Sequence, residues 1–201
     1  MIELGNNFRF DLSVYKSNIA ILFSGGADSA LLFYLSALEI INNNLDKQIT
    51  LYVIDRHNKP LSYAFDTYER ICEQLDFRKV QLHHLDIIDL PHYMQVPQVI
   101  NIIYHKNLHD ELLLGMNKYP NDTIRPTVIS DFRETPFLKI PFKYYTKDIL
   151  IDVFFKLGIE DILYNTRSCG TPTPEPCKTC FNCRERLWAF NRLGITPNFG
   201  V

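Results

Sequence analysis

Residues 19–29 read Ile-Ala-Ile-Leu-Phe-Ser-Gly-Gly-Ala-Asp-Ser, and this stretch decides the fold class of the chain. Its apolar half predicts a short buried strand, and the Ser-Gly-Gly run that follows predicts a tight turn. Across residues 30–41 the apolar positions recur at helical spacing, and three asparagines at residues 42–44 end this helix. A strand that leads through a glycine turn into a helix indicates an α/β unit.

Strand and helix signals go on alternating after this first unit. Further strands are predicted at residues 49–54, 80–85 and 112–115, and further helices at residues 61–75 and 98–110. Such alternation predicts an α/β, Rossmann-like parallel sheet with helices on both faces. Ligands of such sheets bind beyond the carboxyl ends of the strands, where the Ser-Gly-Gly turn and Asp55 fall.

The second half of the chain is less regular. Residues 116–146 show no clear period, and a loop of this length in a compact domain is usually functional. Thr146 is expected to N-cap a helix over residues 147–157, which Gly158 ends. We therefore expect an α/β domain over residues 1–160, and a cysteine-rich extension over residues 161–201 that packs on the same domain.

The composition narrows the class of protein. With 46% hydrophobic and 22% charged residues, the 201-residue chain has the profile of a soluble globular protein. Its formal net charge of −2 makes nucleic-acid partners unlikely on electrostatic grounds. Polar and charged residues precede any apolar run, so we expect no signal peptide, no membrane span and a cytoplasmic location. Clustered cysteines in that compartment indicate metal ligands before disulfides.

The glycine turn has the features of a phosphate site. Gly25 and Gly26 carry no Cβ that would keep an anion from the backbone, and Ser24 and Ser29 add hydroxyl donors. The helix behind the turn directs its positive end at the anion. Asp28 fits beside a phosphate only with a cation between them, so we assign it a role with Mg²⁺. A plain turn before a capped helix is the alternative, and the full string in this context favours a nucleotide.

Residues 24–29 resemble the fingerprint Ser-Gly-Gly-X-Asp-Ser of the PP-loop ATP pyrophosphatases. The resemblance implies an adenine nucleotide alpha hydrolase-like fold and the use of ATP with Mg²⁺. Such enzymes transfer AMP to an oxygen of the substrate and release pyrophosphate. A nitrogen or sulfur nucleophile then displaces the AMP, and the enzyme supplies no covalent nucleophile.

The tail carries a cysteine cluster. Cys169, Cys177, Cys180 and Cys183 are spaced C-x7-C-x2-C-x2-C, which lets four thiolates complete a closed, structural metal shell. Such a metal contributes on the order of 10 kcal/mol to the order of its segment. Zinc is the favoured ion, and an iron–sulfur cluster stays open as an alternative because similar runs bind such clusters. Cys72 stands alone on a helix and is expected to be a core residue.

The tail also resembles a narrower family. Residues 166–169, Thr-Arg-Ser-Cys, and the run from Cys177 to Arg186 look like Thr-X-Ser-Cys and Cys-Gly-X-Cys-X-X-Cys-X-X-Arg of the 7-cyano-7-deazaguanine (preQ0) synthases. Residues 140–142 and 147–149 resemble two further stretches of that family. The resemblance implies queuosine biosynthesis, with a 7-deazaguanine substrate and ammonia. Residues 55–60 and 97–122 depart from the family pattern, and they would surround the substrate.

Lys147 is the second candidate catalytic residue, beside Asp28. A lysine at the first position of a helix opposes the helix dipole, and this misfit favours an anionic partner, so we assign it a phosphate contact. Asp55 ends a strand and is either a turn residue or a contact to the ribose or adenine of ATP. Arg56 and His57 follow it as weaker candidates for recognition of the acceptor.

The leading hypothesis is an ATP-dependent carbon–nitrogen ligase that adenylates a carboxylate or carbonyl oxygen and uses ammonia or another nitrogen nucleophile. This enzyme would contain Zn²⁺ and act on a small molecule. A homodimer is one candidate assembly. A PP-loop enzyme of tRNA thiolation is one alternative. It is disfavoured because the only cysteine outside the cluster is Cys72. A nucleotide-binding module without catalysis, which has lost its substrate site, is the other.

Overall fold

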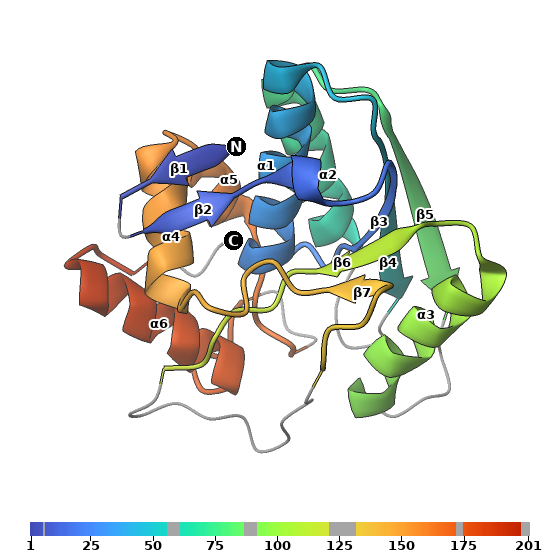
Figure 1. Ribbon diagram of the computed structural model, residues 1–201. Coiled ribbons are helices and arrows are strands. Elements are labelled where there is room, and N and C mark those ends of the chain that lie inside the picture. Colours follow the sequence, from blue (N-terminus) through green and yellow to red (C-terminus); the bar gives the residue numbers. More distant parts are fainter. Residues whose placement is uncertain (6, 56–60, 87–91, 121–131, 172–174, 198–201) are drawn as a thin grey trace.

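The computed structural model describes residues 1–5, 7–55, 61–86, 92–120, 132–171 and 175–197 (Figure 1). Within these ranges a parallel sheet of five strands has the order β5-β4-β3-β6-β7. Its strands are β3 (Asn18–Leu22), β4 (Gln48–Asp55), β5 (Val80–Asp86), β6 (Glu111–Leu114) and β7 (Leu138–Lys139). A separate antiparallel pair is formed by β1 (Ile2–Leu4) and β2 (Phe8–Phe10). A 3-10 turn, η1 (Leu12–Val14), leads from this pair towards β3.

Helices cover both faces of the sheet, as the sequence predicts (Figure 1). They are α1 (Ala27–Asn43), α2 (Ser62–Leu75), α3 (His92–Lys106), α4 (Lys147–Lys156), α5 (Glu160–Asn165) and α6 (Phe181–Leu193). Ile19 and Ile21 of β3 join the hydrophobic cluster under α1, α2 and the three C-terminal helices. Ala20 and Leu22 join a second cluster with α3. This alternation along a central strand buries both faces of β3, which explains its unbroken apolar run.

The Rossmann-like α/β fold and its order of strands and helices are confirmed, with differences in detail. Helix α3 begins at His92 rather than at residue 98, and it continues through Pro97. Val99 and Ile103 are buried against the sheet, and this packing offsets the backbone hydrogen bond that Pro97 cannot donate. The β1–β2 pair and the short strand β7 are not predicted by periodicity, because strands of two or three residues are too short to show one.

The start of α4 also differs from expectation. Thr146 stands at the N-cap position, but its side chain makes no capping hydrogen bond to the helix backbone. Its hydroxyl instead donates to the carboxylate of Asp148. The expected end of the helix near Gly158, whose φ is +66°, is confirmed.

A buried arginine ties the C-terminal helices together. Arg186 of α6 donates through Nη1 to the carbonyl oxygen of Thr166 at 3.1 Å and to its Oγ1 at 2.9 Å. Its Nη2 donates to the carbonyl oxygen of Leu163 at 2.8 Å, at the end of α5. Burial lowers the pKa of Arg186 to about 10, which still leaves it charged at neutral pH.

In the described part of the chain, no helix has the length and apolar character needed to cross a membrane.

Candidate functional site

The Ser-Gly-Gly turn joins the carboxyl end of β3 to α1. Two positions have room for no residue larger than glycine: one lies in the turn and one in the segment after β6 that packs against it. Gly25 has φ +67°, and a Cβ there would stand 2.7 Å from Cα of Ala64. A Cβ on Gly115, which follows β6, would meet the backbone of Asp28 at 3.0 Å. These close approaches let the turn, α2 and the end of β6 pack against one another without side chains between them.

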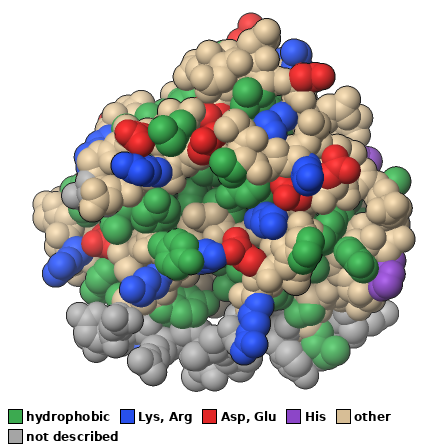
Figure 2. All heavy atoms as spheres, in the orientation of Figure 1, with side chains coloured by type: hydrophobic (Ala, Val, Ile, Leu, Met, Phe, Trp, Pro, Cys, Tyr) green, Lys and Arg blue, Asp and Glu red, His purple; other side chains and the backbone are tan. Residues whose placement is uncertain are grey.

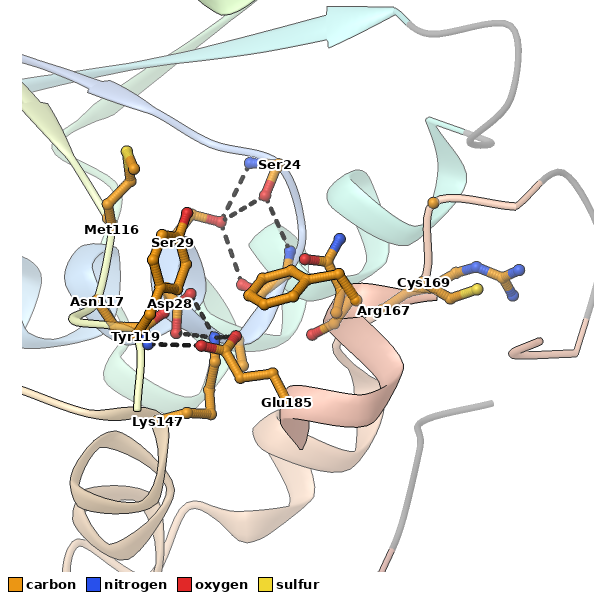
Figure 3. A pocket seen from close by; sticks show the side chains of 17 residues that line it. Ser24, Asp28, Ser29, Met116, Asn117, Tyr119, Lys147, Arg167, Cys169 and Glu185 are labelled. Carbon is orange, nitrogen blue, oxygen red and sulfur yellow. Dashed lines mark hydrogen bonds and ion pairs between the residues drawn. The ribbon is translucent and has the colours of Figure 1, made fainter. Parts of the chain in front are cut away.

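The two serines of the turn brace it from inside (Figure 3). Ser29 Oγ donates to the carbonyl oxygen of Gly26 at 3.1 Å and accepts from the backbone N–H of Ser24 at 3.1 Å. Ser24 Oγ lies 3.1 Å from Ser29 Oγ and accepts from the N–H of Gly26 at 3.3 Å. The sequence treats both hydroxyls as phosphate donors. In the structure they hold the loop in shape, so its geometry is set before any ligand binds.

A cavity of about 210 Å³ opens beside this turn (Figure 3). One wall is the turn and the first residues of α1, whose N-cap Gly26 has no capping side chain. The backbone N–H groups of a first helical turn have no partner within the helix and attract anions. The other walls are residues 115–119 after β6, Lys147 at the start of α4, and residues 167–170 and 181–185 of the tail.

A buried ion cluster forms the floor of the cavity. Lys147 Nζ donates to both carboxylate oxygens of Asp28 and lies 3.5 Å from Oε2 of Glu185. The Lys147 side chain is 6% exposed, that of Glu185 4% and that of Asp28 18%. Asn117 Nδ2 donates to the other Glu185 oxygen at 2.9 Å. The structure thus brings together the two predicted catalytic residues, which are 119 positions apart in sequence.

The charge of Lys147 follows from this cluster. Burial alone would lower the pKa of Lys147, but the carboxylates of Asp28 and Glu185 outweigh it and raise the pKa above its usual value. Burial raises the pKa of Glu185, and the ammonium of Lys147 opposes that rise. The cavity therefore contains a permanent cation next to the amino end of α1, an arrangement suited to the phosphates of a nucleotide.

The tail reaches the turn directly through Arg167. Its backbone N–H donates to the carbonyl oxygen of Gly25 at 3.0 Å. Its guanidinium lies 4.8 Å over the ring of Tyr63 on α2, and Nη1 donates to the Tyr63 hydroxyl at 3.2 Å. Sequence reasoning missed this role. The one signal in the sequence was an arginine two residues before a cysteine of the predicted metal set.

The four tail cysteines converge on one point. Their sulfur atoms all lie within 4.8 Å of one another. Zinc–sulfur bonds of about 2.3 Å in a tetrahedron place the sulfurs about 3.8 Å apart, so the set fits a metal with a small contraction. The N–H of Cys177 points to Sγ of Cys169, and that of Cys180 to Sγ of Cys177, each at 3.3 Å. Such N–H···S contacts stabilise thiolates over thiols.

Two cysteines illustrate how the surroundings decide their chemistry. A hydrogen bond from the Thr179 side chain, with the N–H of Cys180, lowers the pKa of Cys177 to about 5. At neutral pH Cys177 is a thiolate ready to bind a metal. Cys72 lies on α2 and is buried in the hydrophobic core cluster, and this burial raises the pKa of its thiol. The expectation that Cys72 is a core residue is confirmed.

A second cavity, of about 270 Å³, adjoins the first at the carboxyl ends of the strands. It shares Ser24, Ser29 and Met116 with the phosphate side, and its far wall is apolar, with Ile54 and Leu114. The first cavity has an aromatic rim, where Tyr119 and Phe181 meet edge to face at 5.2 Å between ring centroids. The site therefore joins a polar end at the glycine turn to apolar and aromatic surfaces.

Three predicted positions lie partly or wholly outside the described residues. Asp55 is the last residue of β4 and pairs in register with Asp86, but its side chain is outside the described part. Arg56 and His57, the candidates for acceptor recognition, are outside it altogether. Their roles stay predictions.

No protein-family model matches this sequence, and no curated protein matches it. The U34-tRNA thiolase NcsA from Methanococcus maripaludis, solved with its [4Fe-4S] cluster, is similar in structure. Its TM-score is 0.52 at 12% sequence identity, over 88% of this chain and 66% of that one. An NAD⁺ synthetase from Burkholderia pseudomallei gives a TM-score of 0.42 at 12% identity, over 84% of this chain and 65% of that one.

This chain spans just under two thirds of the length of each of those proteins. The likeness to the thiolase shows that the chain has a Rossmann-like α/β fold. At this level of identity the likeness establishes the fold and carries no assignment of substrate.

Proposed function

We propose that this protein is an ATP-dependent enzyme that adenylates a carboxylate or carbonyl oxygen, releases pyrophosphate and admits a nitrogen nucleophile. The observation that carries the proposal is the convergence of three features on one cavity. They are the braced Ser-Gly-Gly turn with the amino end of α1, the carboxylate of Asp28 and the buried ammonium of Lys147. Fixed donors of this kind stabilise the charge that develops on a leaving pyrophosphate.

The residues divide the work as follows. The first turn of α1 binds the phosphates, and the charged Lys147 approaches them from the opposite wall. Asp28 is the residue that would hold Mg²⁺, which supplies neutralisation of the phosphate charge. Asp28 is the most exposed member of the ion cluster, so it is the carboxylate best placed to exchange its lysine for a metal.

For the acceptor we propose 7-carboxy-7-deazaguanine, converted to the nitrile with ammonia. The resemblance of residues 166–186 to the preQ0 synthases supports this choice, and the ring-lined cavities have room for a flat heterocycle. A nitrile keeps neither carboxylate oxygen, so two adenylations are needed. The first leads through displacement of AMP by ammonia to the amide. The second activates the amide oxygen, which leaves as part of AMP.

For the tail we propose a zinc ion, with a structural role. Four thiolates at one point fill a tetrahedral shell and leave no position for a substrate. The zinc would order the segments that carry Arg167 and Glu185, which line the cavity. An [4Fe-4S] cluster is the alternative occupant, because it also takes four thiolates.

The second candidate function is tRNA thiolation, and the structural likeness to the U34-tRNA thiolase with its [4Fe-4S] cluster favours it. Two observations weigh against it. The one cysteine outside the cluster, Cys72, is buried in the core. On the face that Figure 2 shows, basic and acidic side chains are interspersed rather than gathered into the basic surface that a tRNA needs.

Pyrophosphate release separates these candidates. The protein with ATP and Mg²⁺ is given either 7-carboxy-7-deazaguanine with ammonium or unmodified tRNA with sulfide. We expect turnover with the first acceptor and none after Asp28→Ala. Turnover with tRNA alone would replace the first proposal by the second. ATP binding without pyrophosphate from either acceptor would support a module without catalysis. Elemental analysis for zinc, iron and acid-labile sulfide decides the metal independently.

A further inference from the structure

Glu185 is the member of the buried ion cluster that the proposed chemistry does not use. It lies on the first turns of α6, and its carboxylate lies beside Lys147 (Figure 3). Its two carboxylate oxygens are divided between two partners. Oε2 is 3.5 Å from Lys147 Nζ, and Oε1 accepts from Asn117 Nδ2 at 2.9 Å. The side chain is 4% exposed, so these partners stand in for water.

A buried carboxylate in this place needs an explanation other than packing. Burying an ion pair gains no more stability than apolar residues of the same size would, so such pairs are weak devices for stability. Within the cluster Lys147 makes its close hydrogen bonds to Asp28, and the carboxylate of Glu185 stands farther away, at 3.5 Å. The carboxylate of Glu185 can still hold the Lys147 ammonium when Asp28 moves to another partner.

ATP binding would create that situation. The ammonium of Lys147 has three N–H donors. Two of them point to the oxygens of Asp28, and Glu185 is the remaining anionic neighbour within 4 Å in the described residues. If Asp28 takes up Mg²⁺, those two donors become available to phosphate oxygens. The contact with Glu185 then keeps Nζ at the cavity wall.

We propose that Glu185 is a positioning residue, which holds Lys147 against the phosphate end of the cavity while Asp28 changes partner. This rests on the proposed use of ATP and Mg²⁺. Asn117, from the segment after β6, fixes the carboxylate from its other side. Glu185 therefore acts on the nucleotide through Lys147 and does not touch the reacting atoms.

The location of Glu185 links this role to the cysteine site. Glu185 follows Cys183 by two residues, and Cys180 is the N-cap of the same helix. The cysteine site and the Glu185 carboxylate thus lie at the same end of α6. Glu185 and Lys147 belong to different helices, so their contact depends on the packing of α6 along α4.

The test uses three substitutions at one position and a matched control. Glu185→Leu removes charge and acceptor, Glu185→Gln keeps an acceptor without the charge, and Glu185→Asp keeps the charge on a shorter arm. Glu111→Gln is the control. Glu111 is also a buried glutamate with a lysine near it, Lys139 at 4.0 Å, and one N–H donor, that of Lys16 at 2.8 Å. It lies at the other end of the sheet, away from the cavity.

We expect Glu185→Leu to raise the KM for ATP about 10-fold or more, the size of one charge-assisted hydrogen bond. Glu185→Gln should raise it less, and Glu185→Asp should restore part of the loss. Glu111→Gln should lower the thermal unfolding midpoint but leave the KM unchanged. An unchanged KM in Glu185→Leu, or an equal change in Glu111→Gln, would overturn the proposal.

A second measurement needs no ATP. Acylation of lysines by an amine-directed reagent, followed residue by residue with mass spectrometry, reports how firmly Lys147 is held. The labelling is done in the Asp28→Ala background, where Glu185 is the remaining carboxylate beside Lys147 in the described residues. We expect Lys147 to react several-fold faster when Glu185→Leu is added and at an unchanged rate when Glu111→Gln is added. Equal rates with and without Glu185→Leu would refute the positioning role even if the parent protein binds ATP. Faster labelling together with no ATP binding by the parent protein would retain the contact and reject the proposed function.

Discussion

The two main walls of the cavity are built in different ways. The wall formed by residues 24–29 stands on β3 and α1, whose apolar side chains lie in the core of the sheet. The wall formed by residues 167–170 and 181–185 is anchored by four cysteines and by the buried Arg186. The first is ordered by hydrophobic burial, and the second by polar contacts and by the four cysteines, for which we propose a metal. Different substitutions should therefore disrupt the structure of each wall.

Loss of the metal should give the largest effect and break the second wall alone. Cys180→Ser removes one ligand, and a structural metal contributes on the order of 10 kcal/mol to its segment. We expect loss of the metal, loss of pyrophosphate release and fast hydrogen exchange in α6. The amides of β3 and α1 should stay protected. Equal loss of protection in β3 would show that the two walls do not fold separately.

Lys147 connects the two walls, so its removal should damage function more than fold. Lys147→Met leaves the carboxylates of Asp28 and Glu185 without their cation, which costs about 3 kcal/mol of unfolding free energy. Pyrophosphate release should fall at least about 100-fold. Lys143→Met is the control, because Lys143 forms an exposed ion pair with Glu134 that solvent screens. Comparable loss of activity in both variants would contradict the assignment.

Two glycines with the same backbone conformation allow the cost of backbone strain to be separated from the cost of a steric clash in the first wall. Gly25 has φ +67° and Gly158 has φ +66°. A Cβ on Gly158 meets nothing within 4 Å, so Gly158→Ala should cost about 1 kcal/mol from the backbone alone. At Gly25 a Cβ would also lie 2.7 Å from Ala64 Cα, so Gly25→Ala should cost about 2 kcal/mol or more.

Chemical denaturation measures both costs, and ATP titration should show a loss for Gly25→Ala only. Equal costs would mean that α2 yields freely to the turn, and the first wall would then be less rigid than the structure indicates.

The smallest effect concerns the fifth cysteine. Cys72 is buried in the apolar core, and Cys72→Ala should cost about 1 kcal/mol of unfolding free energy through the space it leaves. Metal content and pyrophosphate release should match the parent protein. A fall in metal content would show that Cys72 belongs with the tail cysteines after all.

Sequence reasoning worked best where one residue pattern fixes one conformation. The apolar run of β3, the glycine turn and the cysteine spacing each predict their structure locally, and each is found. Asn117 and Glu185, 68 residues apart, form a contact that no local pattern contains. Ser24 and Ser29 brace the turn in the structure, and their contact with phosphate stays a prediction, because a hydroxyl in a turn serves equally well as a brace or as a ligand donor.

The sequence by itself determined the α/β order, the glycine turn and the set of cysteines that can share a metal. These follow from periodicity, from the conformational freedom of glycine and from the short span between ligands. Only the tertiary structure decided that Arg167 reaches the turn and that Glu185 and Asp28 share Lys147. The physical reason is that such contacts depend on how distant helices pack. The energy of that packing comes from the whole core and from no single stretch of sequence.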